Sequence, residues 1–426
     1  MTNNAGLAGL LHDRLGLFVH FGLYSLAARH EWVQNRERIP AEDYSRYFER
    51  FDPDLFDADD WARQAKQAGM RYAVLTTKHH EGFCLWDSAL TDYKTTSTPF
   101  GRDLVAEFVT AFRAAGLKVG FYHSLLDWHH PDFPIDGFHP LRDEPDVAER
   151  NPRRDIARYR SYLHAQVREL LTSYGRLDYL FYDFSYPPSV HPEVWGHKGR
   201  DDWGSEELLA MTRELQPGIV VNDRLDLPGD LLTPEQYQPV APMRRNGELM
   251  AWEACQTLNG SWGYDRDNVD FKTPDLLVRM LVDGVSNGGN LLLNVGPTGR
   301  GRFDPAASAA LSGLGVWMDL HDRSIYGAGP SDFTPPPDCR YTQRGERLYL
   351  HLFGWPFEFV HLPGLAGKVA YAQLLHDASE VAMSTVAEGQ VPQTIRMGGL
   401  PAGTLTLKLP VRRPDVAVPV VELFLR

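Results

Sequence analysis

Seven short stretches of the chain are almost continuously apolar, and polar or helical segments separate them. They cover residues 16–22, 72–80, 118–124, 177–184, 219–224, 249–255 and 290–297. Apolar runs of this length are typical of strands that are buried on both faces, as in a parallel sheet. The pattern therefore predicts seven buried strands between residues 16 and 297.

Amphipathic helices fill the spaces between these strands. In residues 154–175 apolar side chains recur at helical spacing, and Gly175 stands where a C-terminal cap belongs. Residues 103–117 repeat the pattern, with Asp103 as the candidate N-cap. Alternating strands and helices predict an α/β fold with a parallel sheet. Their number favours a closed (β/α)8-like barrel of the TIM type. The pattern does not reveal the position of an eighth strand.

The pattern changes after Tyr326. A Pro-rich stretch at 328–338 is typical of a linker. Beyond it short strands such as 420–426 follow, without a strong helical pattern. We therefore predict a barrel domain over residues 1–327, the linker, and a small all-β sandwich domain over residues 339–426.

Composition narrows the class of protein. Of the 426 residues 43% are apolar and 23% charged, which is the balance of a globular protein. No apolar run approaches the roughly 18 residues of a membrane span, and a net charge of −13 argues against nucleic acid as a partner. The N-terminus shows no basic segment followed by an apolar one, so no signal peptide is expected. Three widely spaced cysteines fit reduced thiols and a cytoplasmic location.

Polar and titratable side chains collect where the predicted strands end. They are His20, Lys78, His79, His80, Tyr122, His123, Asp183, Asn222, Asp223, Arg224, Glu253 and Asn294. Because the carboxyl ends of the strands form the active-site face of such a barrel, we expect these side chains to share one site. Their mixture of hydrogen-bond donors and acceptors suits the hydroxyl groups of a sugar.

The histidines also raise the question of a metal. His79 and His80 are adjacent on an extended segment and are expected to point to opposite faces, so they would not readily bind one ion. The sequence holds neither an HExxH nor a CxxC motif. We therefore expect no metal and no cofactor, and we expect these imidazoles to bind substrate hydroxyls.

Cleavage of a glycosidic bond requires two carboxyl groups, one ionised and one that donates a proton. Asp183 closes the apolar strand LDYLFYD, where a charge is costly unless it has a function or a partner. Asp183 is therefore the candidate nucleophile.

Several motifs along residues 10–330 resemble those of glycoside hydrolase family 29, the α-L-fucosidases. They are GLFVHFGLYSL, HEW, YAVLTTKHHEGFCLWDS, GLKVGFYHSLLDW, LDYLFYD, VVNDR, WEACQTLNGSWGYDRDN and GGNLLLNVGPTGRG. The resemblance implies a retaining enzyme that hydrolyses terminal α-L-fucosides, with Asp183 as nucleophile. It implies substrate binding by His20, Glu31, Trp32, His79, His80, Tyr122 and Arg224, and we expect Trp262 to pack against the C6 methyl of the sugar.

The acid/base residue is less closely defined, because its position varies within the family. Glu235 follows VVNDR at an offset similar to that of some relatives and is the first choice. Glu253, in AWEAC, is the second choice and is expected at a strand end. The sequence departs from the family pattern at three places. Phe184 and Ser185 follow the nucleophile where Gly is common, Phe21 stands where Trp is usual, and His30 precedes the Glu-Trp pair where Gly often stands.

Two alternative functions stay open. One is a related α-L-glycosidase of the same family, for example one that acts on α-L-galactosides. The other is a carbohydrate-binding protein that kept the pocket and lost catalysis. The expected partner is a fucosylated oligosaccharide or glycoconjugate. Neither nucleic acid nor a membrane is expected as a partner. The sequence leaves the linkage, the aglycone and the oligomeric state open, a homo-oligomer included.

Overall fold

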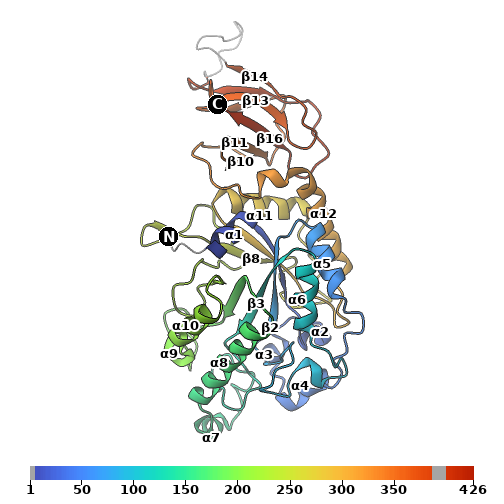
Figure 1. Ribbon diagram of the computed structural model, residues 1–426, viewed down its shortest axis with the longest axis vertical. Helices are drawn as coiled ribbons and strands as arrows, with labels where there is room; N and C mark the ends of the chain where they lie inside the picture. Colours follow the sequence, from blue (N-terminus) through green and yellow to red (C-terminus); the bar gives the residue numbers. More distant parts are fainter. Residues whose placement is uncertain (1–4, 386–399) are drawn as a thin grey trace.

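The computed structural model, which describes residues 5–385 and 400–426, is built around one curled parallel sheet (Figure 1). The strand order is β5-β4-β3-β2-β1-β9-β8. The strands are β1 (Leu15–Val19), β2 (Tyr72–Lys78), β3 (Lys118–Ser124), β4 (Tyr179–Asp183), β5 (Val220–Val221), β8 (Glu253–Thr257) and β9 (Asn290–Val295). All seven predicted strands are confirmed. The largest difference between predicted and observed bounds is at β8, which begins at Glu253, whereas the predicted strand ended near it.

An irregular segment, residues 231–235, lies between the two edge strands of this sheet. Its pairs, all parallel, are Asn222 with Leu231, Leu232 with Trp252, and Glu235 with Cys255. The segment therefore joins the β5 edge to the β8 edge and fills the eighth position of the barrel. It is not a regular strand because it contains Pro234, which has no N–H to donate. The hydrophobic pattern did not reveal it because only Leu231 and Leu232 form an apolar run before Thr233 and Pro234.

Helices cover the outside of the sheet (Figure 1). The longer ones are α5 (Ala58–Gln67), α6 (Leu104–Ala114), α8 (Ile156–Ser173), α10 (Ser205–Leu215), α11 (Pro274–Ser286) and α12 (Pro305–His321). The shorter ones are α1 (Ala5–Asp13), α2 (Tyr24–Ala27), α3 (Val33–Arg36), α4 (Ala41–Phe48), α7 (Val147–Arg150) and α9 (Arg200–Trp203). Asp103 caps α6 as predicted, accepting the Ala106 N–H at 2.8 Å. Within the described residues, no helix is both long and apolar enough for a membrane span.

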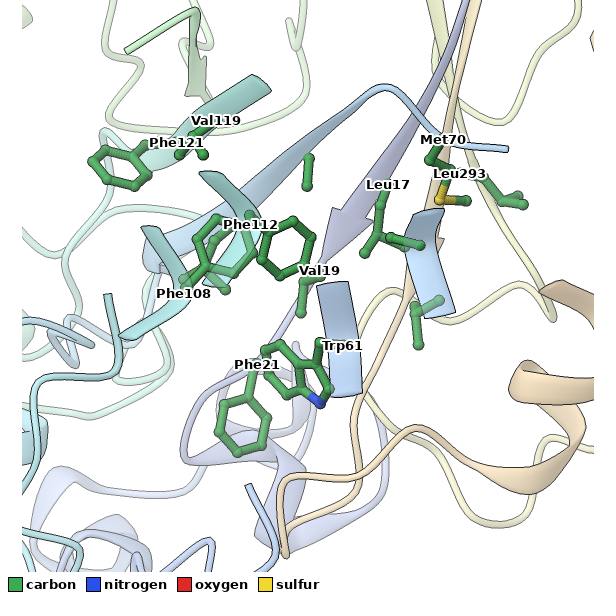
Figure 2. Close-up of a cluster of buried hydrophobic side chains, with 14 of the residues drawn as sticks. Leu17, Val19, Phe21, Trp61, Met70, Phe108, Phe112, Val119, Phe121 and Leu293 are labelled. Atoms are coloured by element: carbon green, nitrogen blue, oxygen red, sulfur yellow. The ribbon is translucent and has the colours of Figure 1, made fainter. Parts of the chain in front are cut away.

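Alternate side chains of each strand face two different cores. On β1, Leu17 and Val19 point outward and share a cluster with Trp61 of α5 and Phe108 of α6 (Figure 2). Phe18, between them, points into the barrel. The interior set is Leu10, Phe18, Tyr72, Val74, Tyr122, Tyr179, Phe181, Val220, Leu231, Cys255 and Leu292. Because the interior is filled, a substrate can enter only at the mouth of the barrel.

The C-terminal part of the chain is all-β. One antiparallel sheet contains β10 (Cys339–Arg344), β11 (Arg347–Leu352), β16 (Val420–Leu425) and β13 (Val369–Leu374), and a second contains β12 (Phe359–Leu362), β15 (Leu405–Lys408) and β14 (Ala382–Thr385). A separate short hairpin joins β6 (Arg244–Arg245) to β7 (Glu248–Leu249). This confirms a barrel followed by an all-β part, whereas the exact residue limits of the two domains and the linker stay predictions.

The C-terminal sheets lie beside α11 and α12, at one end of the barrel, and α2, α3 and α4 lie at the other end (Figure 1). Arg340 of β10 pairs with Asp283 of α11 at 2.6 Å. The indole N–H of Trp317 in α12 donates to the Val418 carbonyl at 2.8 Å. Since α2 to α4 follow the carboxyl end of β1, the all-β part sits away from the mouth of the barrel.

Candidate active site

A pocket of about 370 Å³ lies at the carboxyl ends of the barrel strands. It is lined by Phe18, His20, Trp32, His79, His80, Tyr122, Phe181, Asp183, Phe184, Arg224, Glu235, Cys255 and Trp262. Nine of the eleven predicted site residues are among them. The other two, Glu31 and Glu253, are buried elsewhere.

Two carboxyl groups meet at one guanidinium group in this pocket. Arg224 Nη1 donates to Asp183 Oδ1 at 2.8 Å and lies 2.7 Å from Glu235 Oε2. Because both oxygens contact the same nitrogen, they are no more than 5.5 Å apart. The Tyr122 hydroxyl donates to the second Asp183 oxygen at 2.8 Å. The Asp183 side chain is 12% exposed and that of Glu235 is 39% exposed, so one carboxyl lies deep in the pocket and the other at its rim.

The segment that closes the barrel also holds this arrangement. Arg224 Nε donates to Thr233 Oγ1 at 3.1 Å, and the Thr233 hydroxyl donates to Asp223 at 2.7 Å. Burial lowers the pKa of Arg224, but the charges of Asp183 and Glu235 outweigh it and raise that pKa above its ordinary value. The guanidinium therefore stays cationic between the two carboxyl groups.

The three pocket histidines are neutral. Burial lowers the pKa of His20 to about 3, and burial lowers those of His79 and His80 well below their usual range. His20 Nδ1 lies 2.7 Å from Asn294 Oδ1, and His80 Nδ1 lies 2.6 Å from Ser124 Oγ. Neutral imidazoles offer one donor and one acceptor each, which suits sugar hydroxyls.

The expected divergence of His79 and His80 is wrong. Both line the pocket, and their ring centroids are only 4.0 Å apart. Strand β2 ends at Lys78, so the alternation of a strand does not extend to the two histidines. Among residues 5–385 and 400–426, no group of three or more His, Cys, Asp or Glu side chains is placed to hold a metal ion.

An aromatic wall forms the apolar side of the pocket. The Phe18 ring lies 5.9 Å from that of Trp262 and 5.2 Å from that of Phe181. Tyr122 stacks on Phe181 at 5.8 Å. The pocket thus combines charged groups, neutral imidazoles and an apolar surface, as a site for a small ligand with polar and apolar sides would.

Comparison with known proteins identifies the family. The α-L-fucosidase sequence profile matches residues 10–323. The chain belongs to the α-L-fucosidase family. It is therefore a glycoside hydrolase, and the resemblance to family 29 is confirmed.

Relatives and solved structures agree with this assignment. Tissue α-L-fucosidase of Bos taurus is 30% identical over 374 residues, which cover 80% of this chain and 74% of the relative. α-L-Fucosidase isoenzyme 1 from Paenibacillus thiaminolyticus is 43% identical, with a TM-score of 0.90 and 99% of each chain covered. A Bacteroides thetaiotaomicron family 29 α-L-fucosidase, solved as a trapped covalent intermediate, is 26% identical with a TM-score of 0.84. It covers 99% of this chain and 96% of that one.

Two of the departures from the fucosidase pattern occupy left-handed backbone. Phe184 has φ +76° and His30 has φ +84°, a region that favours glycine. The Phe184 ring lies 5.2 Å from Trp32, 4.9 Å from His80 and 4.9 Å from Phe138. These ring contacts hold the strained residue directly after Asp183, where it forms part of the pocket wall.

Glu31 supports the pocket of this fucosidase from behind. Its Oε2 accepts the Gly263 N–H at 2.8 Å and so holds the loop that carries Trp262. Burial raises the pKa of Glu31 to about 7. Glu31 is 1% exposed and is not part of the pocket lining, and its contact with a sugar stays a prediction.

Glu253 is not at the mouth of the barrel, so its predicted position is wrong. It begins β8, in register with Asn290 at the start of β9, and it accepts a hydrogen bond from the Tyr72 hydroxyl at the start of β2. Burial raises its pKa to about 7. The error arose because the strand continues through the polar residues Gln256 and Thr257, which the hydrophobic pattern excluded.

Four pocket residues were not among the predicted site residues. They are Phe18, Phe181, Phe184 and Cys255. A search for polar groups at strand ends passes over apolar side chains. The two-residue period of a strand could have found Phe181, because it lies two positions before Asp183 and therefore on the same face.

Proposed function

We propose that this enzyme is a retaining exo-α-L-fucosidase that works by double displacement. Asp183 attacks the anomeric carbon of a terminal fucose and forms a covalent glycosyl ester, while Glu235 donates its proton to the departing glycosidic oxygen. Glu235 then removes a proton from water, and the hydroxide oxygen attacks the anomeric carbon. This second attack breaks the ester bond, restores Asp183 and releases fucose with retained configuration.

The separation of the two carboxyl groups carries this proposal. Retaining glycosidases place them about 5–5.5 Å apart, whereas inverting enzymes leave about 6.5–9.5 Å for a water molecule. The upper limit of 5.5 Å between Asp183 Oδ1 and Glu235 Oε2 fits the first class. It leaves too little room for a water between nucleophile and anomeric carbon.

The surroundings of the two carboxyl groups support different roles. Asp183 is held by Tyr122 and Arg224, which fix its orientation and match its negative charge. Glu235 is more exposed at the rim, where both a leaving group and water can reach it. The trapped covalent intermediate of the Bacteroides relative supports the same type of reaction.

The lining of the pocket supports fucose as the sugar. Neutral His20, His79 and His80 can bind ring hydroxyls, and the wall that includes Trp262 can pack against the C6 methyl. One additional hydroxyl or methylene group on the sugar changes its binding free energy in such a pocket by only about 1–3 kcal/mol. We therefore expect α-L-galactosides to be turned over more slowly than α-L-fucosides, and not to be excluded.

A panel of aryl glycosides tests the proposal. The enzyme should hydrolyse an aryl α-L-fucoside faster than the α-L-galactoside, and it should leave β-glycosides of other common hexoses untouched. Proton NMR early in the reaction should show α-L-fucose as the first product. No fucoside turnover at high enzyme concentration would overturn the substrate, and β-L-fucose as the first product would overturn the retaining mechanism.

A further inference from the structure

Asn294 lies at the end of β9, and both ends of its side-chain amide are occupied. The amide nitrogen donates to the Trp262 carbonyl at 2.7 Å. A carbonyl oxygen can only accept, so this bond fixes which end of the amide faces Trp262. The amide oxygen must then face His20 Nδ1, at 2.7 Å. Because that oxygen also can only accept, His20 Nδ1 must carry a proton.

Ser124 imposes the same condition on His80. Its hydroxyl donates to the Leu126 carbonyl at 2.9 Å, and this uses its single proton. The Ser124 oxygen can therefore only accept from His80 Nδ1, at 2.6 Å. Ser124 and Asn294 are both buried, so water does not offer either imidazole another partner on that side. His80 Nδ1 must carry a proton as well.

A neutral imidazole has one N–H, so a proton on Nδ1 leaves a lone pair on Nε2. We propose that Asn294 and Ser124 are positioning residues that hold His20 and His80 as Nδ1-protonated tautomers. Both histidines then present an Nε2 acceptor to the pocket and select sugar hydroxyls that donate hydrogen bonds. The protons on Nδ1 follow from the hydrogen bonds and the free Nε2 from the burial of both rings, whereas the role in sugar selection rests on the proposed fucosidase function.

The surroundings keep both imidazoles neutral. His20 faces His79 of the β2 end, Tyr122 of β3 and Trp262, with ring centroids 5.7, 5.4 and 5.2 Å away. His80 packs against Trp32, Trp128 and Phe184. The charged groups in the same pocket are Asp183, Arg224 and Glu235, and both carboxyl groups pair with the guanidinium. Burial lowers the pKa values of both histidines, so a second proton is disfavoured.

Nitrogen NMR of the free enzyme tests the tautomers without any turnover. The protein is labelled with 15N-histidine, and the His20 and His80 signals are identified by their loss in His20→Gln and His80→Gln. At pH 7 both rings should show a protonated Nδ1 and an unprotonated Nε2. Protonation at Nε2 of either ring would overturn the assignment for that ring, whether or not the enzyme hydrolyses fucosides.

Two variants test the positioning role. Ser124→Ala removes the acceptor of His80, and Asn294→Leu removes that of His20 together with the tie to Trp262. Each should add the Nε2-protonated tautomer to the NMR spectrum of its histidine. Each should raise KM for an aryl fucoside by about 10- to 100-fold, the loss expected for an unpaired buried group, with a smaller change in kcat. A spectrum unchanged from the wild type would overturn the role of that residue.

Asn290→Leu is the matched control. Asn290 is on the same strand and the same face as Asn294 and is equally buried, but its amide donates to the Leu10 carbonyl at the opposite end of the barrel. The variant should lose stability while KM and the His20 spectrum stay as in the wild type. An equal rise in KM for Asn290→Leu and Asn294→Leu would assign the effect to β9 as a whole and overturn the positioning role.

Analogues of free L-fucose test the acceptor role directly. Replacing a hydroxyl by fluorine keeps a weak acceptor but removes the donor. At each ring position whose hydroxyl contacts His20 or His80, the deoxy and fluoro analogues should therefore lose inhibition equally, by about 10-fold or more. If the fluoro analogues kept most of the inhibition that the deoxy analogues lose, the histidines would be donors and the proposal would be wrong. Weak inhibition by L-fucose itself would count against the fucosidase proposal instead.

Discussion

Replacement of Glu253 by glutamine separates the two acid/base candidates. Glu253 is buried at the amino end of β8, where the Tyr72 hydroxyl donates to it. Glutamine has the same shape, keeps an acceptor for Tyr72 and cannot ionise. If Glu253 is a structural group, Glu253→Gln should keep its activity and change only the dependence of stability on pH.

The magnitude follows from the pKa of this carboxyl. Burial raises it from an ordinary 4.5 to about 7. Below pH 4.5 the carboxyl is protonated in both the folded and the unfolded chain. Between pH 4.5 and 7 the unfolded chain ionises first, so the wild type loses stability as pH rises, and above pH 7 the loss is complete. At about 1.36 kcal/mol per pKa unit, the loss amounts to about 3 kcal/mol.

Urea unfolding at pH 4.5 and pH 8 measures this loss of stability. The free energy of unfolding of Glu253→Gln minus that of the wild type should increase by about 3 kcal/mol between the two pH values. Buried Glu31 and Glu81 titrate in both proteins and cancel in this difference. A difference that does not change with pH would refute the burial argument. A loss of activity that grows with the basicity of the leaving group would make Glu253 the acid.

Three further predictions concern the pocket. Glu235→Ala should slow cleavage of a fucosyl disaccharide by about 10²–10⁴-fold but bond breaking in a nitrophenyl fucoside far less, because a stable phenolate needs little protonation. Equal losses for both substrates would exclude Glu235 as the acid. Asp183→Gly should reduce turnover by several orders of magnitude, and azide should restore part of it as an external nucleophile. Near-normal activity would show that another group is the nucleophile. Phe184→Gly should be more stable to urea than Phe184→Ala by about 1 kcal/mol, since both lose the ring but only glycine tolerates φ +76° without strain. The reverse order would show that the backbone at this position is not strained.

The sequence predicted the barrel because apolar periodicity reports burial directly. Strands buried on both faces appear as continuous apolar runs, and all seven runs became strands of one sheet. The site was predictable for a related reason. In a parallel barrel every strand delivers its last residues to the same face, so His20, Tyr122 and Asp183 had to meet. Neither inference needed to know which strands are neighbours.

The same pattern could not locate the segment 231–235 or the end of β8. The pattern of buried residues does not show at which end of a strand a residue lies. It also does not predict a strand at Pro234, where the hydrogen bonding is interrupted. Glu253 therefore stayed the second choice behind Glu235 in the sequence. The fold separates them along β8, because β8 begins at Glu253 whereas Glu235 pairs with Cys255, two residues nearer the mouth.

The sequence by itself determined the fold class, the family and most of the residues around the pocket, because apolar patterns and local motifs encode them. Only the tertiary structure decided the orientation of the two histidine rings, the burial of Glu253 and the sharing of Arg224 by two carboxyl groups. These properties depend on partners far apart along the chain, such as His20 and Asn294 or Tyr72 and Glu253. A hydrogen bond or a buried charge is set by distances of a few ångströms, and folding alone brings such atoms together.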